Sequence, residues 1–375
     1  MGEWKEYKLT EVADFKTGKL NSNAAVKNGL YPFFTCSPET LSIDEFAFDT
    51  KAILLAGNNA EGNFAIKYYD GKFNAYQRTY VITGKNNKVA DLKYLFYSIK
   101  SQLQEFKNIS IGSATRFLTM QIFDGFILNL PPFTEQKSIA SILSSLDDKI
   151  DLLHRQNATL EKLAETLFRQ WFVEEAKEEW ENCVLEDLCS QINSGGTPST
   201  KIETYYNGNI NWYSTKELND NYLFESISKI TQDGLENSAA KLFPKGTVLI
   251  AIYAAPTVGR LGILGNQSAF NQAACGLIAN DKICCKEFIY LYLKNQRNEL
   301  NAMASGSAQQ NLNVGKIKTY PAFIPDDITM NKFKREIIPF FEKIEKNAMQ
   351  IRTIKALRDT LLPKLMSGEV RVDQD

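Results

Sequence analysis

The sequence predicts an α+β protein made of two tandem globular pieces, each followed by a long helix. Three observations lead to this prediction: a long internal repeat, short apolar runs separated by turn residues, and two heptad patterns. A chain of 375 residues, 44% of them hydrophobic, is long enough for about two domains of ~100–200 residues each. We expect globular pieces at 1–130 and 181–325, and helical segments at 131–180 and 326–375.

The internal repeat is long and has a fixed offset. "IGSATRFLTMQIFDGFILNLPP" at 111–132 aligns without a gap with "SGSAQQNLNVGKIKTYPAFIPD" at 305–326, an offset of 194 residues. The same offset continues into 156–168 and 350–362, whereas 7–19 and 183–196 align more loosely at an offset of 176. Because self-similarity at a fixed period indicates repeated structural units, we expect a pseudo-two-fold internal repeat.

Each globular piece has the pattern of a β-rich structure closed by helices. Helices are expected at 91–107 and 286–303, after the strands of each piece. Glycine and asparagine separate the apolar runs, which is typical of strands joined by turns. The runs are "KAILLAG" at 51–57, "FAIKYY" at 64–69, "TYVITG" at 79–84, "GTVLIAIY" at 246–253 and "LGILG" at 261–265.

The two helical segments carry apolar residues in alternating steps of four and three. The first pattern runs from Ile139 to Trp171 and the second from Phe333 to Leu365. Such a sustained heptad favours pairing of the two helices as an antiparallel coiled coil between the globular pieces. The heptad positions that face the other helix form the seam, and Asn157 and Asn347 lie at such positions, where a polar residue fixes the register. The alternative is two ordinary core helices in separate domains. A helix of 32 residues rises roughly 48 Å. If the globular pieces bind DNA, a rod of that length can place them about one turn of DNA apart or more.

Prolines predict where these helices begin and end. Pro131 and Pro132 should end the last strand of the first piece, after which Thr134 can cap the first helix. In the second segment Asp327 is the expected N-cap. Pro339 predicts a bend or a late start, and Pro363 predicts the last turn.

Composition excludes several classes of protein. The formal net charge is −1, and the charges counted by segment, +2, −4, 0 and +1 for 1–130, 131–180, 181–325 and 326–375, rule out a polybasic tail. A local DNA-facing patch stays possible in 1–130, which has 15 basic and 13 acidic residues. Six cysteines without a Cys-x-x-Cys pair, together with one histidine, do not make the usual zinc site, so buried or incidental thiols are expected. The charged start and the lack of a run of eighteen apolar residues favour a cytoplasmic protein.

Polar loops recur at matched places and are candidate DNA readers. "NAYQR" at 74–78 aligns with "FNQAA" at 270–274, and "GSATR" at 112–116 aligns with "GSAQQN" at 306–311. Asn, Gln and Arg pair with base edges, while hydroxyls and lysines contact phosphates; for any single residue a solvated turn is the alternative. The candidate DNA-binding residues are Lys16, Lys19, Asn74, Gln77, Arg78, Ser113, Thr115, Arg116, Thr197, Ser199, Lys201, Trp212, Lys216, Asn271, Gln272, Ser307, Gln309, Gln310 and Asn311.

In combination, these features resemble the DNA-specificity subunit of type I restriction-modification systems. The resemblance rests on "GSATRFLT", "LPPFTEQKSIASILSSLDDKIDLLHRQNATLEKLAETLFRQWF", "INSGGTPST", "YYNGNINWYSTKEL" and "LRDTLLPKLMSGEVRV", which occur in the expected order over essentially the whole chain. The resemblance implies target-recognition domains at 1–130 and 181–325, each reading half of a bipartite double-stranded DNA site, and conserved spacer helices at 131–180 and 326–375.

The resemblance also implies partners. Two modification subunits, which use S-adenosylmethionine to methylate adenine, would dock on the helices, and restriction subunits driven by ATP and Mg would join through them. No cofactor is expected on this chain. Glu135, Gln136 and Lys137, expected to be exposed, are candidate docking residues.

Two enzymatic functions are possible alternatives. A self-contained adenine methyltransferase would use "NLPPF" at 129–133 to hold adenine, but Leu130 stands where the chemistry needs a polar side chain, and no glycine-rich donor loop is evident. A nuclease is suggested only by Pro325-Asp326, which better fits the approach to a helix. The sequence therefore predicts a non-catalytic DNA-recognition subunit.

Overall fold

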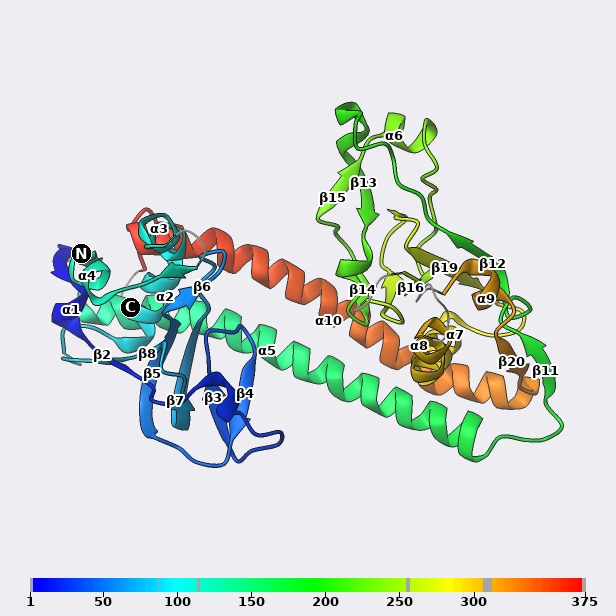
Figure 1. Ribbon diagram of the computed structural model, residues 1–375, viewed down its shortest axis with the longest axis horizontal. Helices are drawn as coiled ribbons and strands as arrows, with labels where there is room; N and C mark the ends of the chain where they lie inside the picture. The colour runs from blue at the N-terminus through cyan, green and yellow to red at the C-terminus, as the bar shows by residue number, and fades with distance from the viewer. Residues whose placement is uncertain (1–2, 87, 113–114, 254–256, 306–311, 373–375) are drawn as a thin grey trace. The chain divides into compact units, whose positions relative to one another are not determined.

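The computed structural model describes residues 3–86, 88–112, 115–253, 257–305 and 312–372. The chain divides into two compact units: unit 1 contains Met1–Ile150 and Thr353–Asp375, and unit 2 contains Asp151–Arg352. Two long helices, α5 (Phe133–Arg169) and α10 (Asp327–Ser367), each contribute one part to unit 1 and the other part to unit 2 (Figure 1). The structure is thus of mixed α and β content, as predicted.

Unit 1 is built around a six-stranded sheet with strand order β2-β8-β5-β7-β3-β4. The strands β5 and β7 pair antiparallel from Phe48↔Phe73 to Leu55↔Ile66, whereas β3 joins β7 in parallel. The predicted runs at 51–57, 64–69 and 79–84 fall on β5, β7 and β8, because apolar β-branched and aromatic residues suit a half-buried sheet. The strands are β2 (Ala13–Thr17), β3 (Tyr31–Phe34), β4 (Thr40–Ile43), β5 (Phe48–Ala56), β7 (Ile66–Ala75) and β8 (Thr79–Gly84).

Helices and two small strand pairs complete unit 1. Its core brings Ile53 and Ile82 of the sheet together with Leu95 of α2, Leu143 of α5 and Leu365 of α10, all buried. The pair β1·β10 leads directly into α5. The remaining elements are β1 (Lys5–Lys8), α1 (Leu9–Val12), η1 (Ser22–Ala24), β6 (Asn58–Asn59), α2 (Leu92–Ser101), α3 (Leu103–Ile109), β9 (Arg116–Phe117), α4 (Met120–Asp124) and β10 (Ile127–Leu130).

Unit 2 contains a five-stranded sheet of order β12-β19-β16-β17-β14 and a three-stranded sheet of order β15-β13-β18. Phe168 of α5, Phe288 of α7 and Phe333 of α10 meet in its core. The strands are β11 (Glu181–Val184), β12 (Cys189–Ser194), β13 (Tyr206–Tyr213), β14 (Asn221–Leu223), β15 (Ser228–Ile230), β16 (Val248–Ala251), β17 (Leu261–Leu264), β18 (Ala269–Phe270), β19 (Ala274–Ala279) and β20 (Pro321–Ile324). The helices are α6 (Gln232–Glu236), α7 (Lys286–Asn295), α8 (Arg297–Ser305) and α9 (Val314–Lys318), with the turns η2 (Gln170–Glu174), η3 (Glu203–Tyr205) and η4 (Thr215–Glu217).

Elements of the two units begin at the same two offsets that the sequence repeat has. β1 and β2 begin 176 residues before β11 and β12, and α2, α3, α4, β10 and α5 begin 194 residues before α7, α8, α9, β20 and α10. The strand register agrees as well, because Lys5 pairs with Leu130 in unit 1 and Glu181 pairs with Ile324 in unit 2. The repeated sequence therefore forms the same elements twice.

Within each unit, α5 and α10 run in opposite directions and bury their apolar faces. In unit 2, Asn347 Nδ2 donates to Asn157 Oδ1 at 2.8 Å, and Phe168 lies against Phe333 at a ring-centroid distance of 6.1 Å. In unit 1, Arg358 Nη1 donates to Asp147 Oδ1 at 2.7 Å. Both asparagines predicted on the seam are thus in contact, and Asn347 is fully buried.

The helix ends differ from those expected. Helix α5 begins at Phe133, so its N-cap is Pro132 and not the predicted Thr134. The carbonyl of Pro132 accepts the first helical hydrogen bond, from Gln136 N at 3.0 Å. Proline can occupy this position because the N-cap residue needs no N–H of its own. Helix α10 is capped by Asp326 rather than Asp327, since Asp326 Oδ1 accepts from Thr329 N at 2.9 Å.

The two prolines of α10 also depart from expectation. The helix continues through Pro339 and Pro363 to Ser367, so it neither starts late at the first proline nor ends at the second. Both prolines lie on the exposed side. There water can reach the carbonyl that loses its partner, while the buried seam on the other side holds the helix together. None of the helices within the described ranges combines the length and the apolar character of a membrane span.

Candidate nucleic-acid interface

Several predicted readers of unit 1 meet at the turn between β7 and β8. Leu20 forms a parallel bridge with Tyr76, which brings the segment that carries Lys19 beside Gln77 and Arg78. All three of these polar side chains are exposed. The arrangement gives one edge of unit 1 two cations beside a glutamine amide, a combination suited to phosphate and base contacts.

A second strand pair extends this edge of unit 1. The guanidinium carbon of Arg78 lies 5.4 Å from the centre of the Phe117 ring. Next to Phe117 on β9, Arg116 pairs with Asn59 of β6, and its Nη1 donates to Ser110 O at 3.3 Å. Arg116 is therefore held by the protein through one nitrogen and is half-buried, while Arg78 is the more accessible cation.

The predicted readers of unit 2 form a corresponding group. Thr197 donates its hydroxyl hydrogen bond to Oε1 of Gln272. The backbone of Gly196 lies against the same turn, because its N–H donates to Phe270 O at 2.9 Å. Gln272 is exposed and Thr197 is half-buried. Hydroxyl, amide and backbone groups thus converge at the turn between β18 and β19.

Three predicted readers are instead occupied by the protein itself. Asn74 is 5% exposed, and its side chain donates to Glu45 O at 3.2 Å and accepts from Ala75 N at 2.9 Å. The prediction of Asn74 as a DNA contact is therefore wrong: it ties down the end of β7. Trp212 is half-buried and its Nε1 donates to Gly196 O at 2.9 Å, while Asn271 Oδ1 accepts from Ala273 N at 3.2 Å. Both shape the turn of unit 2 rather than reach outward.

The remaining candidates divide into three groups. Lys16 on β2, Ser199 and Lys201 after β12, and Lys216 on η4 are exposed; Thr115 is half-buried. Their part in DNA binding stays a prediction. Ser113, Ser307, Gln309, Gln310 and Asn311 lie outside the described residues.

Sequence reasoning missed polar residues that the fold brings to these edges. Asn21 Oδ1 accepts from Gln77 Nε2 at 2.7 Å, and Lys107 Nζ donates to Asn63 Oδ1 at 2.9 Å. A polar run, "GKLNSN" at 18–23, was the signal available for Asn21. The pairing itself joins residues far apart in the sequence, so no local pattern could indicate it.

The expectation that Glu135 and Gln136 are exposed is wrong. Glu135 is 3% exposed and its carboxylate receives two hydrogen bonds from Arg371, at 2.6 and 2.7 Å. Gln136 is 1% exposed and bonds the backbone of Asp91, Val89 and Pro131 at 2.9 Å each. These polar side chains turn inward because the start of α5 packs against α2 and the strand end before it.

Only the third of the docking candidates is accessible. Lys137 is exposed, with Nζ 4.7 Å from the centre of the Phe133 ring. Glu135 and Gln136 instead fasten α5 into unit 1, so a docking surface has to be sought elsewhere on the helices.

The residues that suggested enzymes are structural. Leu130 is buried on β10, opposite Lys5. The Asp326 carboxylate accepts from Lys177 Nζ at 2.8 Å and Trp180 Nε1 at 3.1 Å; the lysine, followed by the amide of Thr329, holds the pKa of Asp326 well below its usual range. This carboxylate caps and anchors α10, which agrees with the expected role of Pro325-Asp326 as a helix lead-in.

The six cysteines are free thiols, and Cys275, Cys284 and Cys285 are buried. Burial raises the pKa of Cys189, Cys275 and Cys284 to about 12, so these thiols stay protonated at neutral pH. In the described ranges, no three side chains of His, Cys, Asp or Glu are placed together to hold a metal ion.

Two units that share a series of elements at two fixed offsets, each with a polar turn between two strands, define a tandem-repeat recognition protein. Comparison with known proteins gives the family. The model of the type I restriction modification DNA specificity domain matches the chain twice over, at residues 1–162 and 177–357. The chain therefore belongs to the family of type I restriction-modification DNA-specificity subunits, whose members recognise DNA and are not enzymes by themselves.

Individual relatives agree with this assignment. The specificity subunit of the type I restriction enzyme EcoDI of Escherichia coli is 38% identical over 170 residues, which cover 45% of this chain and 36% of that protein. The MjaIX specificity subunit of Methanocaldococcus jannaschii is 28% identical over 314 residues, covering 78% of this chain and 72% of that protein. Both relatives are specificity subunits, so the alternative of a self-contained methyltransferase is not supported.

A solved structure has the same fold. The S subunit of the type I restriction-modification system from M. genitalium aligns with a TM-score of 0.65 over 99% of this chain and 97% of that chain, at 17% sequence identity. The similarity therefore extends over both units.

Proposed function

We propose that this chain reads a bipartite double-stranded DNA site, with one target-recognition domain, at 1–130 and 181–325, for each half-site. The main support for this proposal is that the same series of elements occurs twice, at two fixed sequence offsets. Two domains built from the same repeated elements match a site with two halves. The matched polar turns at Gln77 and Gln272 supply groups suited to base contacts at both places.

The helices at 131–180 and 326–375 complete the proposal as a spacer. Two observations support a spacer role. The seam residues of α5 and α10 are buried or half-buried along both helices, and the helices run antiparallel within each unit. An antiparallel coiled coil along the whole of both helices would set the distance between the half-sites. A polar pair such as Asn157 and Asn347 fixes register at some cost in stability.

We place the docking sites of two identical modification subunits on a stripe of repeated residues. Thr159, Leu163 and Thr166 of α5 recur as Thr353, Leu357 and Thr360 of α10, and all six are exposed. Their steps of four and three put each set on one helix face. Several positions that face the other helix differ instead, as Asn157 against Ile351 and Ala164 against Arg358, although Ile150 and Ile344, and likewise Leu167 and Leu361, are the same.

The repeated exposed residues support the choice of this partner. An exposed leucine has no packing reason to be repeated, yet Leu163 and Leu357 are 48% and 47% exposed. Repetition of exposed residues that packing does not require is expected if the same partner surface binds twice. The modification subunit is the partner that a type I complex would hold in two copies.

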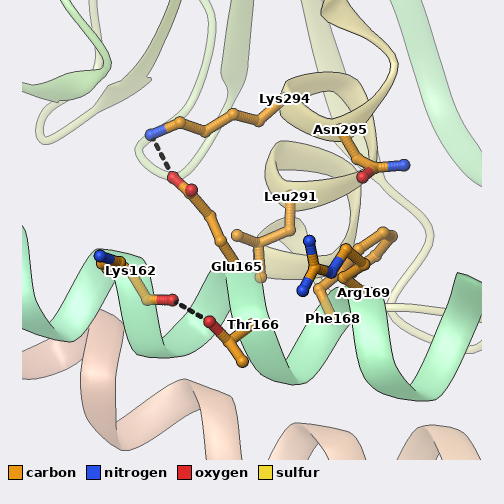
Figure 2. A pocket seen from close by; sticks show the side chains of 8 residues that line it. All are labelled: Lys162, Glu165, Thr166, Phe168, Arg169, Leu291, Lys294 and Asn295. Atoms are coloured by element: carbon orange, nitrogen blue, oxygen red, sulfur yellow. Dashed lines mark hydrogen bonds and ion pairs between the residues drawn. The ribbon is translucent and has the colours of Figure 1, made fainter. Parts of the chain in front are cut away.

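In unit 2 the stripe borders a hollow between α5 and α7. Figure 2 shows Thr166 beside Lys162, whose carbonyl accepts from the Thr166 hydroxyl at 2.8 Å, with Glu165 reaching Lys294 at 2.7 Å. Charged groups rim this hollow and Leu291 lies at its base. A partner side chain with an apolar stem and a polar end would fit there.

The other components belong to the partners. S-adenosylmethionine would bind the modification subunits, and ATP with Mg the restriction subunits that join through them. A cytoplasmic location follows from the DNA partner and is part of the proposal.

The DNA-reading function is tested by binding measurements on the full chain assembled with its modification subunit. We expect tight binding to duplexes that carry both half-sites, and affinity that falls steeply as salt is raised, because phosphate contacts release counterions. Equal affinity for unrelated duplexes at every salt concentration would contradict sequence-specific reading.

A further inference from the structure

One tight turn is built in the same way in both units. In unit 1 it spans Tyr76–Thr79, between β7 and β8; in unit 2 it spans Asn271–Ala274, between β18 and β19. The first N–H of each turn donates to the end of a neighbouring strand, Tyr76 to Phe34 O and Asn271 to Tyr213 O, both at 2.9 Å. Each turn then closes on itself, with Thr79 N donating to Tyr76 O at 2.8 Å and Ala274 N to Asn271 O at 3.2 Å.

These hydrogen bonds define which residues correspond. The carbonyls of Arg78 and Ala273 occupy the same position, because they accept from Gly57 N and Ile252 N at 2.8 Å each. Gln77 therefore corresponds to Gln272. The sequence alignment of 74–78 with 270–274 is wrong by one residue, since it followed residue types, whereas backbone pairing determines the structural match.

A second segment supports the glutamine in both units. After β2 and β12 the chain passes so close to the turn that only glycine fits: a Cβ on Gly18 would lie 1.7 Å from Ala75 O, and one on Gly195 would lie 2.0 Å from Phe270 O. The same segment then brings a polar side chain to the glutamine. Gln77 Nε2 donates to Asn21 Oδ1 at 2.7 Å, and Gln272 Oε1 accepts from Thr197 Oγ1.

These contacts position the two glutamine side chains but leave part of their hydrogen-bonding capacity available. An amide can make four hydrogen bonds, so each glutamine keeps at least one donor and one acceptor for another molecule. Restricting a long exposed side chain costs rotamer entropy, and a side chain that is held beforehand loses less entropy on binding. Before the gapless repeat begins, the sequences of the two recognition domains align only loosely, so a supported glutamine at the same backbone position in both domains indicates a shared role.

We propose that Gln77 and Gln272 are equivalent base-reading residues, each of which contacts an adenine edge in the major groove of its own half-site. Glutamine pairs bidentately with adenine N6 and N7. The following position differs, Arg78 in unit 1 and Ala273 in unit 2, so unit 1 alone adds a cation at this point of the turn. This inference rests on the proposed DNA-reading function and assigns residues within it.

The test uses the full chain assembled with its modification subunit, with binding measured on duplexes in which each base pair of each half-site is varied in turn. Gln77→Ala should abolish the preference at one position of one half-site, with a loss of about 5- to 150-fold on the preferred duplex. Gln272→Ala should do the same in the other half-site only. Asn21→Ala and Thr197→Ala, which remove the supporting groups, should each cost a few-fold at the same positions.

Matched controls come from exposed glutamines with similar intramolecular partners. Gln104 Nε2 donates to Asn108 Oδ1 at 3.3 Å in unit 1, and Gln232 Nε2 donates to Glu236 Oε1 at 2.7 Å in unit 2. Gln104→Ala and Gln232→Ala should leave affinity and base preference unchanged.

Two outcomes overturn the assignment of the glutamines. If the wild-type complex reads a split site and Gln77→Ala or Gln272→Ala keeps every base preference, the residue is not a reader. A uniform loss of affinity with preferences retained would equally exclude base reading. If the wild-type complex itself binds no split site, the proposed function fails first, and the two failures are thereby distinguished.

Discussion

Asp147 of α5 contacts three polar side chains in unit 1. Its carboxylate accepts from Arg358 Nη1 at 2.7 Å and from the Tyr97 hydroxyl at 2.9 Å, and Lys100 Nζ lies 3.5 Å away. Burial opposes ionisation of this carboxyl, but the hydrogen bond from Arg358 and the charge of Lys100 outweigh it, so the pKa of Asp147 lies below its ordinary value of 3.8. One residue thereby ties α2, α5 and α10 together.

Asp147→Asn should lower the free energy of unfolding at pH 7 by about 2 kcal/mol. This figure is smaller than for a fully buried ion pair, because water partly reaches the site and screens the charges. Because the folded pKa is depressed, the stabilisation is present above the unfolded value near 3.8 and is lost as pH falls through the folded pKa. Urea unfolding of wild type and variant between pH 7 and the acid range should therefore show the difference shrink.

Asp148→Asn is the matched control, since the neighbouring Asp148 is exposed. It should change stability by less than about 0.5 kcal/mol at any pH. If the difference in unfolding free energy between wild type and Asp147→Asn stays constant down to acid pH, the charge of Asp147 does not stabilise the protein as proposed.

The helix pair depends on a buried polar contact in unit 2. Asn347 is fully buried, and its Nδ2 donates to Gln156 Oε1 at 3.3 Å as well as to Asn157. Asn347→Ala leaves a cavity and removes the donor to Asn157 Oδ1, and should cost about 2–3 kcal/mol. The double variant Asn157→Leu with Asn347→Leu should be neutral or stabilising in thermal unfolding, because both polar partners leave together. If the double variant is less stable than Asn347→Ala, the asparagine contact contributes directly to the free energy of unfolding, and a role only in fixing the register of the two helices is contradicted.

The outer face of the helices governs assembly in this account. Leu163→Glu and Leu357→Glu should each remove one modification subunit, so that the mass of the complex falls by one copy, and the double variant should bind none. Burying a charge in an apolar contact is costly, which makes the effect large at each site. Leu152→Glu is the control: Leu152 is 40% exposed on α5, but the equivalent position on α10 is Lys346. Loss of both copies from a single stripe variant would contradict two independent sites.

For the molecule as a whole, the sequence predicted the mixed α and β class and the helices, because periodicity and the internal repeat are encoded along the chain. It could not predict that Glu135 and Gln136 turn inward, since their partners Arg371 and Asp91 are distant in sequence. Of the candidate site, Gln77, Arg78 and Gln272 lie on exposed turns as expected, whereas Asn74 does not. A polar residue type suggests a contact, but only the fold determines whether the protein itself supplies the partner.

The central claim, one half-site for each of two equivalent domains, is tested most directly by mapping methylated adenines in a genome that expresses this chain with its modification subunit. We expect a split motif with a spacer of constant length. Replacing residues 181–325 by the corresponding segment of a relative should change one half of the motif and leave the other half and the spacer unchanged. A continuous motif, or a replacement that alters both halves, would contradict the account.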